Sequence, residues 1–228
     1  MGSRAVVLSP HPDDAVLSCW HVLEEGDVDV VTVFAGVPEQ GATGWWDRLT
    51  GAADSTVRAR ERLEEDTRAL ALAGTAPVTL DLLDAQYRTD NGTPAVAEAI
   101  ADHVRDSDTV YAPLGVFLAP DHRLVRDAAF ELRDDVRVYA DHPHAGIWGL
   151  PGWVTGDGAG PLDVDAGWRG LMIESGLDPD ALRPTVHALD DEVFERKLAA
   201  VRSYGTQVAA LEREAPLSQL RWEVTWTR

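Results

Sequence analysis

The chain has 228 residues, of which 45% are hydrophobic and 26% are charged, a composition typical of a folded globular protein. Its 39 acidic and 20 basic residues give a net charge of −19, which disfavours binding to nucleic acid or to anionic membranes. Cys19 is the single cysteine, so neither an internal disulfide nor a cysteine-rich zinc site can form. The sequence has no apolar run of roughly 18 residues and no secretory pattern at its start, so we expect a cytoplasmic protein.

Short apolar runs alternate with helical patterns, which predicts an α/β fold with β-α units wound onto a mainly parallel sheet. We expect residues 1–228 to form one domain. In chain order the expected elements are strand 5–9, helix 15–23, strand 28–35, loop 36–54, helix 55–73 with a Ser55 cap, strand 78–83, helix 94–105, strand 109–114, helix 123–132, strand 136–140, an irregular excursion 145–184, helix 190–211 and strand 221–226.

Two irregular segments are rich in tryptophan. The 36–54 loop is long enough to cover something, and the Gly/Trp-rich 145–184 excursion is interpreted as an ordered lid or interface of the same domain. Their tryptophans could stack on sugar faces, but burial in the core or in a subunit interface is favoured. The sequence leaves the oligomeric state open, with a homo-oligomer among the alternatives.

The loop after the first strand carries His11, Asp13 and Asp14, at the edge where parallel α/β sheets bind ligands. Alone, this short motif favours a purely structural role, in which Asp13 or Asp14 caps the following helix and His11 is a surface loop residue. Asp121 and His122 follow the expected strand 109–114, so both clusters should face the same rim.

Two histidines and a carboxylate from separate strand ends are the ligand set of an open catalytic zinc site. A zinc ion there makes water more acidic and polarises a carbonyl, and a neighbouring free carboxylate can take the proton of the water.

Residues 9–19, Ser-Pro-His-Pro-Asp-Asp-Ala-Val-Leu-Ser-Cys, resemble the signature of the PIG-L/LmbE family of zinc-dependent N-acetylglucosaminyl deacetylases, in its Asp-Asp-Ala branch. The resemblance covers nearly the whole chain and implies a Rossmann-like sheet sandwiched by helices. Further segments resemble family landmarks in the same order: 33–36, 62–69, 80–88, 113–129, 139–145 and 197–207.

The resemblance implies that His11, Asp14 and His122 hold Zn²⁺ and that Asp13 is the general base that activates the attacking water. It makes Asp121 a residue that orients its neighbours.

The resemblance also places Arg62 and Asp84 near the sugar of the substrate. The alternative for Arg62 is an exposed charge ladder, because Glu65 and Asp66 follow it at the i+3 and i+4 positions of one helix.

One departure concerns the His-x-Asp-His block of the family, in which Ala119 replaces the first histidine. That histidine is commonly assigned to oxyanion stabilisation or to protonation of the leaving amine, and losing a general acid costs roughly 10²- to 10⁴-fold in rate. Asp13 could carry the proton alone, or His142 or His144 could substitute. His144 is the preferred substitute, because it follows the strand 136–140 at the same rim, and a solvated loop histidine is the alternative for both.

We expect a zinc-dependent amidase that removes an N-acyl group from an amino sugar or a related small metabolite, in a natural-product pathway. The alternative is a metal-binding relative with impaired or repurposed chemistry, for which Ala119 is the support. Nucleotide binding is set aside, because no Gly-x-Gly-x-x-Gly follows the first strand. The expected partner is a small-molecule substrate, with neither nucleic acid nor a membrane.

Overall fold

The computed structural model describes residues 4–88, 95–117, 119–157 and 162–228. Their strands are β1 (Ala5–Ser9), β2 (Val28–Thr32), β3 (Pro77–Thr79), β4 (Thr109–Pro113), β5 (Arg137–Tyr139), β6 (Arg183–Ala188) and β7 (Trp222–Thr227). The α-helices are α1 (Asp14–Ser18), α2 (Trp20–Glu25), α3 (Trp45–Leu49), α4 (Ser55–Ala71), α5 (Val96–Arg105), α6 (Pro120–Leu132), α7 (Gly152–Thr155), α8 (Val164–Glu174), α9 (Asp191–Val201) and α10 (Val208–Glu214). Two 3₁₀ turns lie at His144–Gly146 and Leu217–Arg221.

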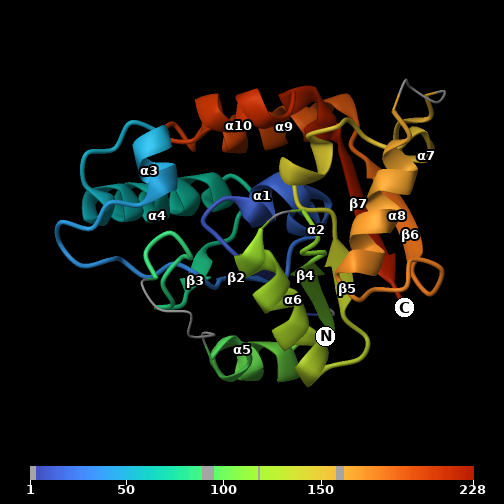
Figure 1. Ribbon diagram of the computed structural model, residues 1–228, viewed down its shortest axis with the longest axis horizontal. Coiled ribbons are helices and arrows are strands. Elements are labelled where there is room, and N and C mark those ends of the chain that lie inside the picture. Colours follow the sequence, from blue (N-terminus) through green and yellow to red (C-terminus); the bar gives the residue numbers. More distant parts are fainter. Residues whose placement is uncertain (1–3, 89–94, 118, 158–161) are drawn as a thin grey trace.

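The strands form one sheet in the order β3-β2-β1-β4-β5-β7-β6 (Figure 1). The pairs from β3 to β5 are parallel, and β7 and β6 add an antiparallel edge. The expected α/β fold with a mainly parallel sheet is therefore confirmed.

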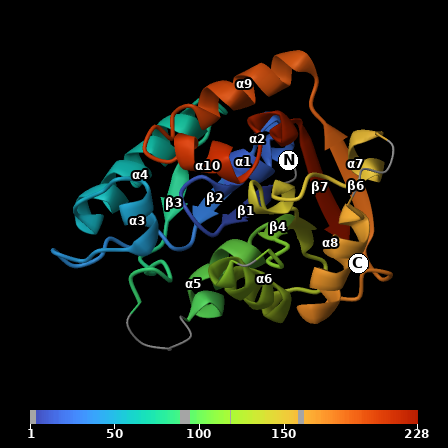
Figure 2. The ribbon, with the colours of Figure 1, turned by 45° about the horizontal axis from the view of Figure 1, so that its top comes forward.

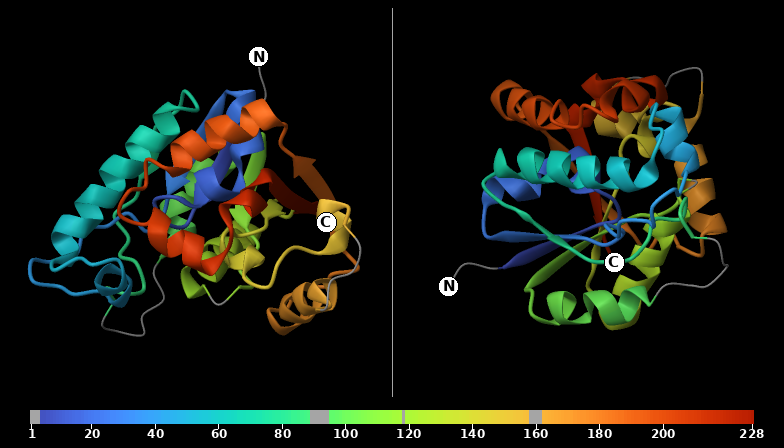
Figure 3. Two further views of the ribbon diagram at one scale, coloured as in Figure 1. Left: turned by 90° about the horizontal axis from the view of Figure 1, so that it is seen from above. Right: turned by 90° about the vertical axis from the view of Figure 1, so that its left-hand side faces the viewer.

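Helices cover both faces of this sheet, with α4, α9 and α10 on one side and α5 and α6 on the other (Figure 3). The alternation of side chains along β1 explains the two layers, because Val7 faces the α1, α2, α4 and α9 side while Val6 and Leu8 face α5 and α6. Near β5 and β7, buried Trp168 of α8 anchors a third apolar cluster.

The helix expected at 15–23 breaks into α1 and α2 at Cys19. Glu223 of β7 causes the break, because its carboxylate accepts the backbone N–H groups of Trp20 and His21 at 2.7 and 2.8 Å. A carboxylate at the start of α2 satisfies donors that a new helix leaves open.

The helix expected at 190–211 also divides, into α9 and α10, and the two helices run in different directions (Figure 2). Side chains of α4 hold the connection between them. Asp66 accepts the hydroxyl of Tyr204 at 2.8 Å, and Glu65 accepts both the backbone N–H and the hydroxyl of Thr206 at 2.8 and 2.7 Å.

Several expected boundaries move. Asp54 rather than Ser55 caps α4, the 36–54 loop contains α3, and α6 begins at Pro120 rather than at 123. The strands β2 and β3 are shorter than expected, and the first residue of the helix expected at 94–105 lies outside the described residues.

The strand β6 was not predicted, because its side chains are mostly exposed and show no alternation. The excursion contributes α7 and α8. No helix in the described ranges is long and apolar enough to cross a bilayer.

Candidate active site

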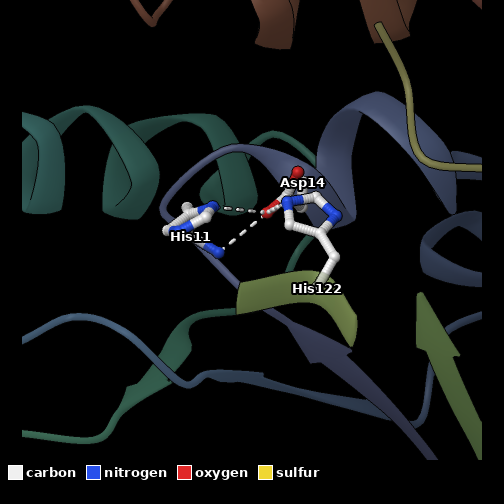
Figure 4. Close-up of side chains that lie close together, drawn as sticks. All are labelled: His11, Asp14 and His122. Carbon is white, nitrogen blue, oxygen red and sulfur yellow. Dashed lines mark hydrogen bonds and ion pairs between the residues drawn. The ribbon is translucent and has the colours of Figure 1, made fainter. Parts of the chain in front are cut away.

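The site lies between the neighbouring strands β1 and β4. At this point the strand order changes direction, because β2 and β3 follow β1 toward one edge of the sheet and β5 follows β4 toward the other. The loop that follows β1 and the first turn of α6 meet there, at the carboxyl ends of the two strands (Figure 4). Because α6 starts at Pro120, a favourable first residue of a helix, His122 projects from its first turn.

His11, Asp14 and His122 converge, and we call them the ligand triad (Figure 4). Asp14 Oδ2 lies 3.4 Å from His11 Nδ1 and 3.4 Å from His122 Nε2, and the three potential ligand atoms lie within 4.8 Å of one another. Two imidazoles and a carboxylate in this spacing fit a divalent zinc ion with room for another ligand.

The opposite nitrogen of each histidine is held by a carboxylate. His122 Nδ1 lies 2.8 Å from Asp141 Oδ1, and His11 Nε2 lies 3.2 Å from Asp121 Oδ2. Such partners fix the orientation of the rings, so that His122 Nε2 and His11 Nδ1 face the centre of the triad.

The side chains of the triad favour opposite charges, because the pKa values of the two histidines are raised and that of Asp14 is lowered. Burial alone would lower the pKa of His11 and of His122, but nearby carboxylates, Asp84 for His11 and Asp14 for His122, raise both. Burial would raise the pKa of Asp14, yet the two histidines lower it to about 2. A carboxylate that stays ionised between two imidazoles can attract a metal cation, which takes the place of the protons on the imidazole nitrogens.

Asp13 is held in a strained backbone conformation, with φ at 149°. Such a conformation costs a residue other than glycine about 1–3 kcal/mol and is found most often at functional sites. Asp13 stands at the N-cap position of α1, but its side chain makes no capping hydrogen bond, so a capping role for its carboxyl group is wrong. Burial, and then the charge of Asp14, raise its pKa well above the ordinary value, and this carboxyl group therefore binds a proton readily.

Arg62 and Asp84 lie beside this carboxyl group. Arg62 Nη1 is 3.8 Å from Asp84 Oδ2, and the charge of Asp13 also acts on the guanidinium. Arg62, Glu65 and Asp66 are all buried, so the exposed charge ladder is wrong.

Asp121 is tied to the wall of the site. Its Oδ1 accepts Arg88 Nη2 at 2.5 Å, and its Oδ2 accepts the backbone N–H of Ala85 at 2.8 Å. These contacts fix the carboxylate that holds His11.

A cavity of about 280 Å³ opens over the triad. Trp45 and Trp46 of α3 line it, whereas Trp168 of the excursion is buried in the core. The remaining lining comes from Asp13, Leu17, Arg62, Asp84, Ala85, Gln86, Ala119, Pro120, Asp121, Pro143, His144, Gln207, Leu211 and Glu214.

The two histidines that follow β5 differ sharply. His144 lines the cavity, and its ring lies edge-on to His122 with 5.6 Å between centroids. His142 is fully buried, and its Nε2 is 3.0 Å from the carbonyl oxygen of Trp222. Burial lowers the pKa of His142 to about 4, so a solvated loop histidine is wrong for this residue.

Sequence reasoning missed Asp141, Gln207 and Glu214 as site residues. Asp141 follows β5 at the same sheet edge, so its position in the chain could have revealed it. Gln207 and Glu214 reach the cavity only because α10 breaks away from α9.

Comparison with known proteins shows the family of this chain. The sequence profile of the family described as GlcNAc-PI de-N-acetylase, PIG-L, matches residues 6–132. This chain belongs to the PIG-L family. The matched region contains the whole ligand triad.

The relatives of this PIG-L chain include deacetylases. It is 34% identical over 145 residues to 2′-N-acetylparomamine deacetylase of Streptomyces fradiae. This match covers 55% of this chain and 50% of the relative, so the chain spans about half the length of that protein. Among solved structures, a deacetylase triple mutant, Orf2*T, of the teicoplanin biosynthetic pathway is 26% identical with a TM-score of 0.74, covering 99% of this chain and 97% of that chain. The A40926 pseudoaglycone deacetylase Dbv21 is also 26% identical, with a TM-score of 0.72 and coverages of 99% and 96%.

Proposed function

We propose that this protein is a zinc-dependent N-deacetylase that removes an acetyl group from an amino sugar in natural-product biosynthesis. The observation that carries the proposal is the pairing of the ligand triad with a buried carboxyl group, Asp13, at the floor of one cavity. The names of the relatives, a 2′-N-acetylparomamine deacetylase, a deacetylase of the teicoplanin pathway and an A40926 pseudoaglycone deacetylase, support the same reaction.

His11, Asp14 and His122 would hold the zinc ion, which supplies Lewis-acid polarisation of the amide carbonyl and makes water acidic enough to attack at neutral pH. Asp13 takes the proton of the attacking water, because it lies beside the triad and binds protons readily. The strained backbone of Asp13 holds its carboxyl group in place for this task.

The amine that leaves must receive a proton, and Ala119 offers none. We assign this role to His144, which lines the cavity and touches the edge of His122. In this assignment Ala119 stands where the His-x-Asp-His block of the family has its first histidine, and His144, which follows β5, supplies the proton instead.

Arg62 and Asp84 would position the sugar. Both line the cavity on the side of Asp13, where a guanidinium and a carboxylate can bond to ring hydroxyl groups. Trp45 and Trp46 offer aromatic faces on which a sugar ring can stack.

Ala119 also supports a second candidate, a metal-binding relative with impaired chemistry. Acetate release from 2′-N-acetylparomamine and from N-acetylglucosamine, with zinc and after chelation, separates the two. Zinc-dependent release supports the enzyme. Stoichiometric zinc binding with no release from any N-acetylated amino sugar would overturn it.

The His144→Asn and Ala119→His variants test the proton donor. We expect His144→Asn to lower the rate by roughly 10²-fold and Ala119→His in that background to restore part of it. An unchanged rate in His144→Asn would exclude His144 as the donor.

A further inference from the structure

The cavity carries more negative than positive charge. The carboxylates of five residues line it, Asp13, Asp14, Asp84, Asp121 and Glu214. Within the described part of the chain, Arg62 is the one lysine or arginine in the lining. A divalent ion on the ligand triad, Arg62 and His144 in its proton-donating form would together offset four of the five charges, which leaves one negative charge facing the ligand.

The residues behind the wall do not remove this excess. Arg88 compensates Asp121 through its 2.5 Å contact, but the buried carboxylate of Asp141 stands behind His122 and adds one negative charge. These two contributions cancel. A low-dielectric cavity with a net negative charge attracts cations and repels anions.

Two parts of the cavity lining carry this negative charge. Arg62 interacts with both Asp13 and Asp84, so these two carboxylates share one guanidinium. Glu214 projects from α10, and its basic neighbour among the described residues is His144 rather than an arginine or a lysine.

One oxygen of Glu214 lacks a partner. Its Oε2 is buried and has no hydrogen-bond partner among the residues that the structure describes. His144 Nδ1 lies 3.3 Å away, an ion-pair distance without the geometry of a hydrogen bond. Because a buried acceptor without a partner is costly, this carboxylate is suited to receive a donor from a ligand.

We propose that Glu214 binds an ammonium group of the substrate, so that the cavity selects N-acetylated amino sugars that carry at least one free amine. This inference rests on the proposed deacetylase function and names its substrate class. Trp45 and Trp46 line the same cavity, and aromatic faces favour both sugar rings and neighbouring cations. Neutral N-acetyl sugars lose the ammonium contact, and phosphorylated ones face repulsion.

The test compares kcat/KM for three substrates, cationic 2′-N-acetylparomamine, neutral methyl N-acetylglucosaminide and anionic N-acetylglucosamine 6-phosphate. The zinc-loaded wild type should prefer them in that order. Glu214→Gln keeps the shape of the side chain and removes its charge, and should lower the preference for the cationic over the neutral substrate about ten- to a hundredfold. Glu212→Gln, on the exposed face of the same helix, is the matched control and should keep the wild-type preference.

Calorimetric binding of paromamine to the zinc-loaded protein gives a readout that does not need turnover. We expect Glu214→Gln to weaken this binding by about tenfold or more and Glu212→Gln to leave it unchanged. If the wild type releases no acetate but binds paromamine through Glu214, the deacetylase proposal fails and the cation site stands. Equal preference and equal paromamine binding in the wild type and Glu214→Gln would overturn the cation site.

Discussion

Two buried polar clusters in this molecule contain the same types of side chain but serve different purposes. One is the ligand triad with Asp13. The other, which we call the Glu223 cluster, consists of Glu223, Lys197 and His21 behind α2. Both bury carboxylates and histidines, and both join elements that are far apart in the sequence.

The Glu223 cluster is closed. The Glu223 carboxylate accepts the backbone N–H groups of Trp20 and His21, Lys197 Nζ at 2.6 Å and His21 Nδ1 at 2.6 Å. Burial alone would raise the pKa of Glu223, but Lys197 and His21 lower it well below its ordinary value.

The ligand triad, by contrast, opens onto a cavity, and Asp13 makes no capping bond there. The contrast separates two uses of buried charge. A carboxylate whose acceptors are all filled by the protein stabilises the fold, and one that faces a cavity is available for chemistry.

The largest expected effect is a loss of activity when a residue of the cluster around the ligand triad is changed. Asp13→Asn should lower the rate of acetate release by roughly 10²- to 10⁴-fold, because the amide cannot take a proton. The free energy of unfolding, from urea denaturation, should change by less than about 1 kcal/mol, since the Asp13 side chain makes no capping hydrogen bond to α1 that the amide could lose. Full activity in Asp13→Asn would remove it from the chemistry.

Glu223→Gln should produce the opposite pattern. It leaves Lys197 buried without its counter-charge, which should lower the free energy of unfolding by about 3–5 kcal/mol. The double variant Lys197→Met, Glu223→Leu is the control and should recover a large part of the loss. A single variant as stable as the wild type would show that the Glu223 cluster does not stabilise the fold.

Asp141→Asn tests the link between the triad and the carboxylate behind it. The amide holds His122 less strongly, so zinc affinity should fall about 10- to 100-fold in competition with a chelator. The circular dichroism spectrum should stay that of the wild type. Unchanged affinity would mean that Asp141 does not orient the ligand.

Within one pH unit, the smallest expected effect is a pH dependence of stability from Asp66. Burial raises its pKa to about 7, although hydrogen bonds from Tyr204 and Thr32 act in the opposite direction. The folded state therefore keeps a proton that the unfolded chain releases near pH 4, so this stabilisation is full below about pH 4 and is lost as the pH rises toward 7.

Urea denaturation of the zinc-free protein at pH 5, 6 and 7 measures this dependence. The stability of the wild type relative to Asp66→Asn should fall by up to about 1.4 kcal/mol per pH unit, because asparagine does not ionise. A constant difference between the two proteins across this range would contradict the raised pKa.

Local pattern predicted the part of the site that the sheet itself assembles. Parallel strands end at one edge, so the loop after β1 and the start of α6 had to face the same rim, which brought His11 and His122 together. The choice of Asp14 rather than Asp13 as the third member of the triad came from the family resemblance.

Long-range contacts decided what the sequence could not show. Glu223 lies 202 residues from His21, and no local pattern shows that its carboxylate ends α1 and starts α2. Glu214 likewise reaches the cavity only after α10 turns away from α9. The single-domain organisation and the cytoplasmic location stay predictions.

A crystal structure of the protein grown with excess Zn²⁺, with anomalous data at the zinc edge, tests the triad directly. We expect one strong peak at the floor of the cavity, bonded to His11 Nδ1, Asp14 Oδ2 and His122 Nε2, with Asp13 beside its open side. No peak there, with the three side chains turned away from one another, would contradict the metal-dependent function derived from them.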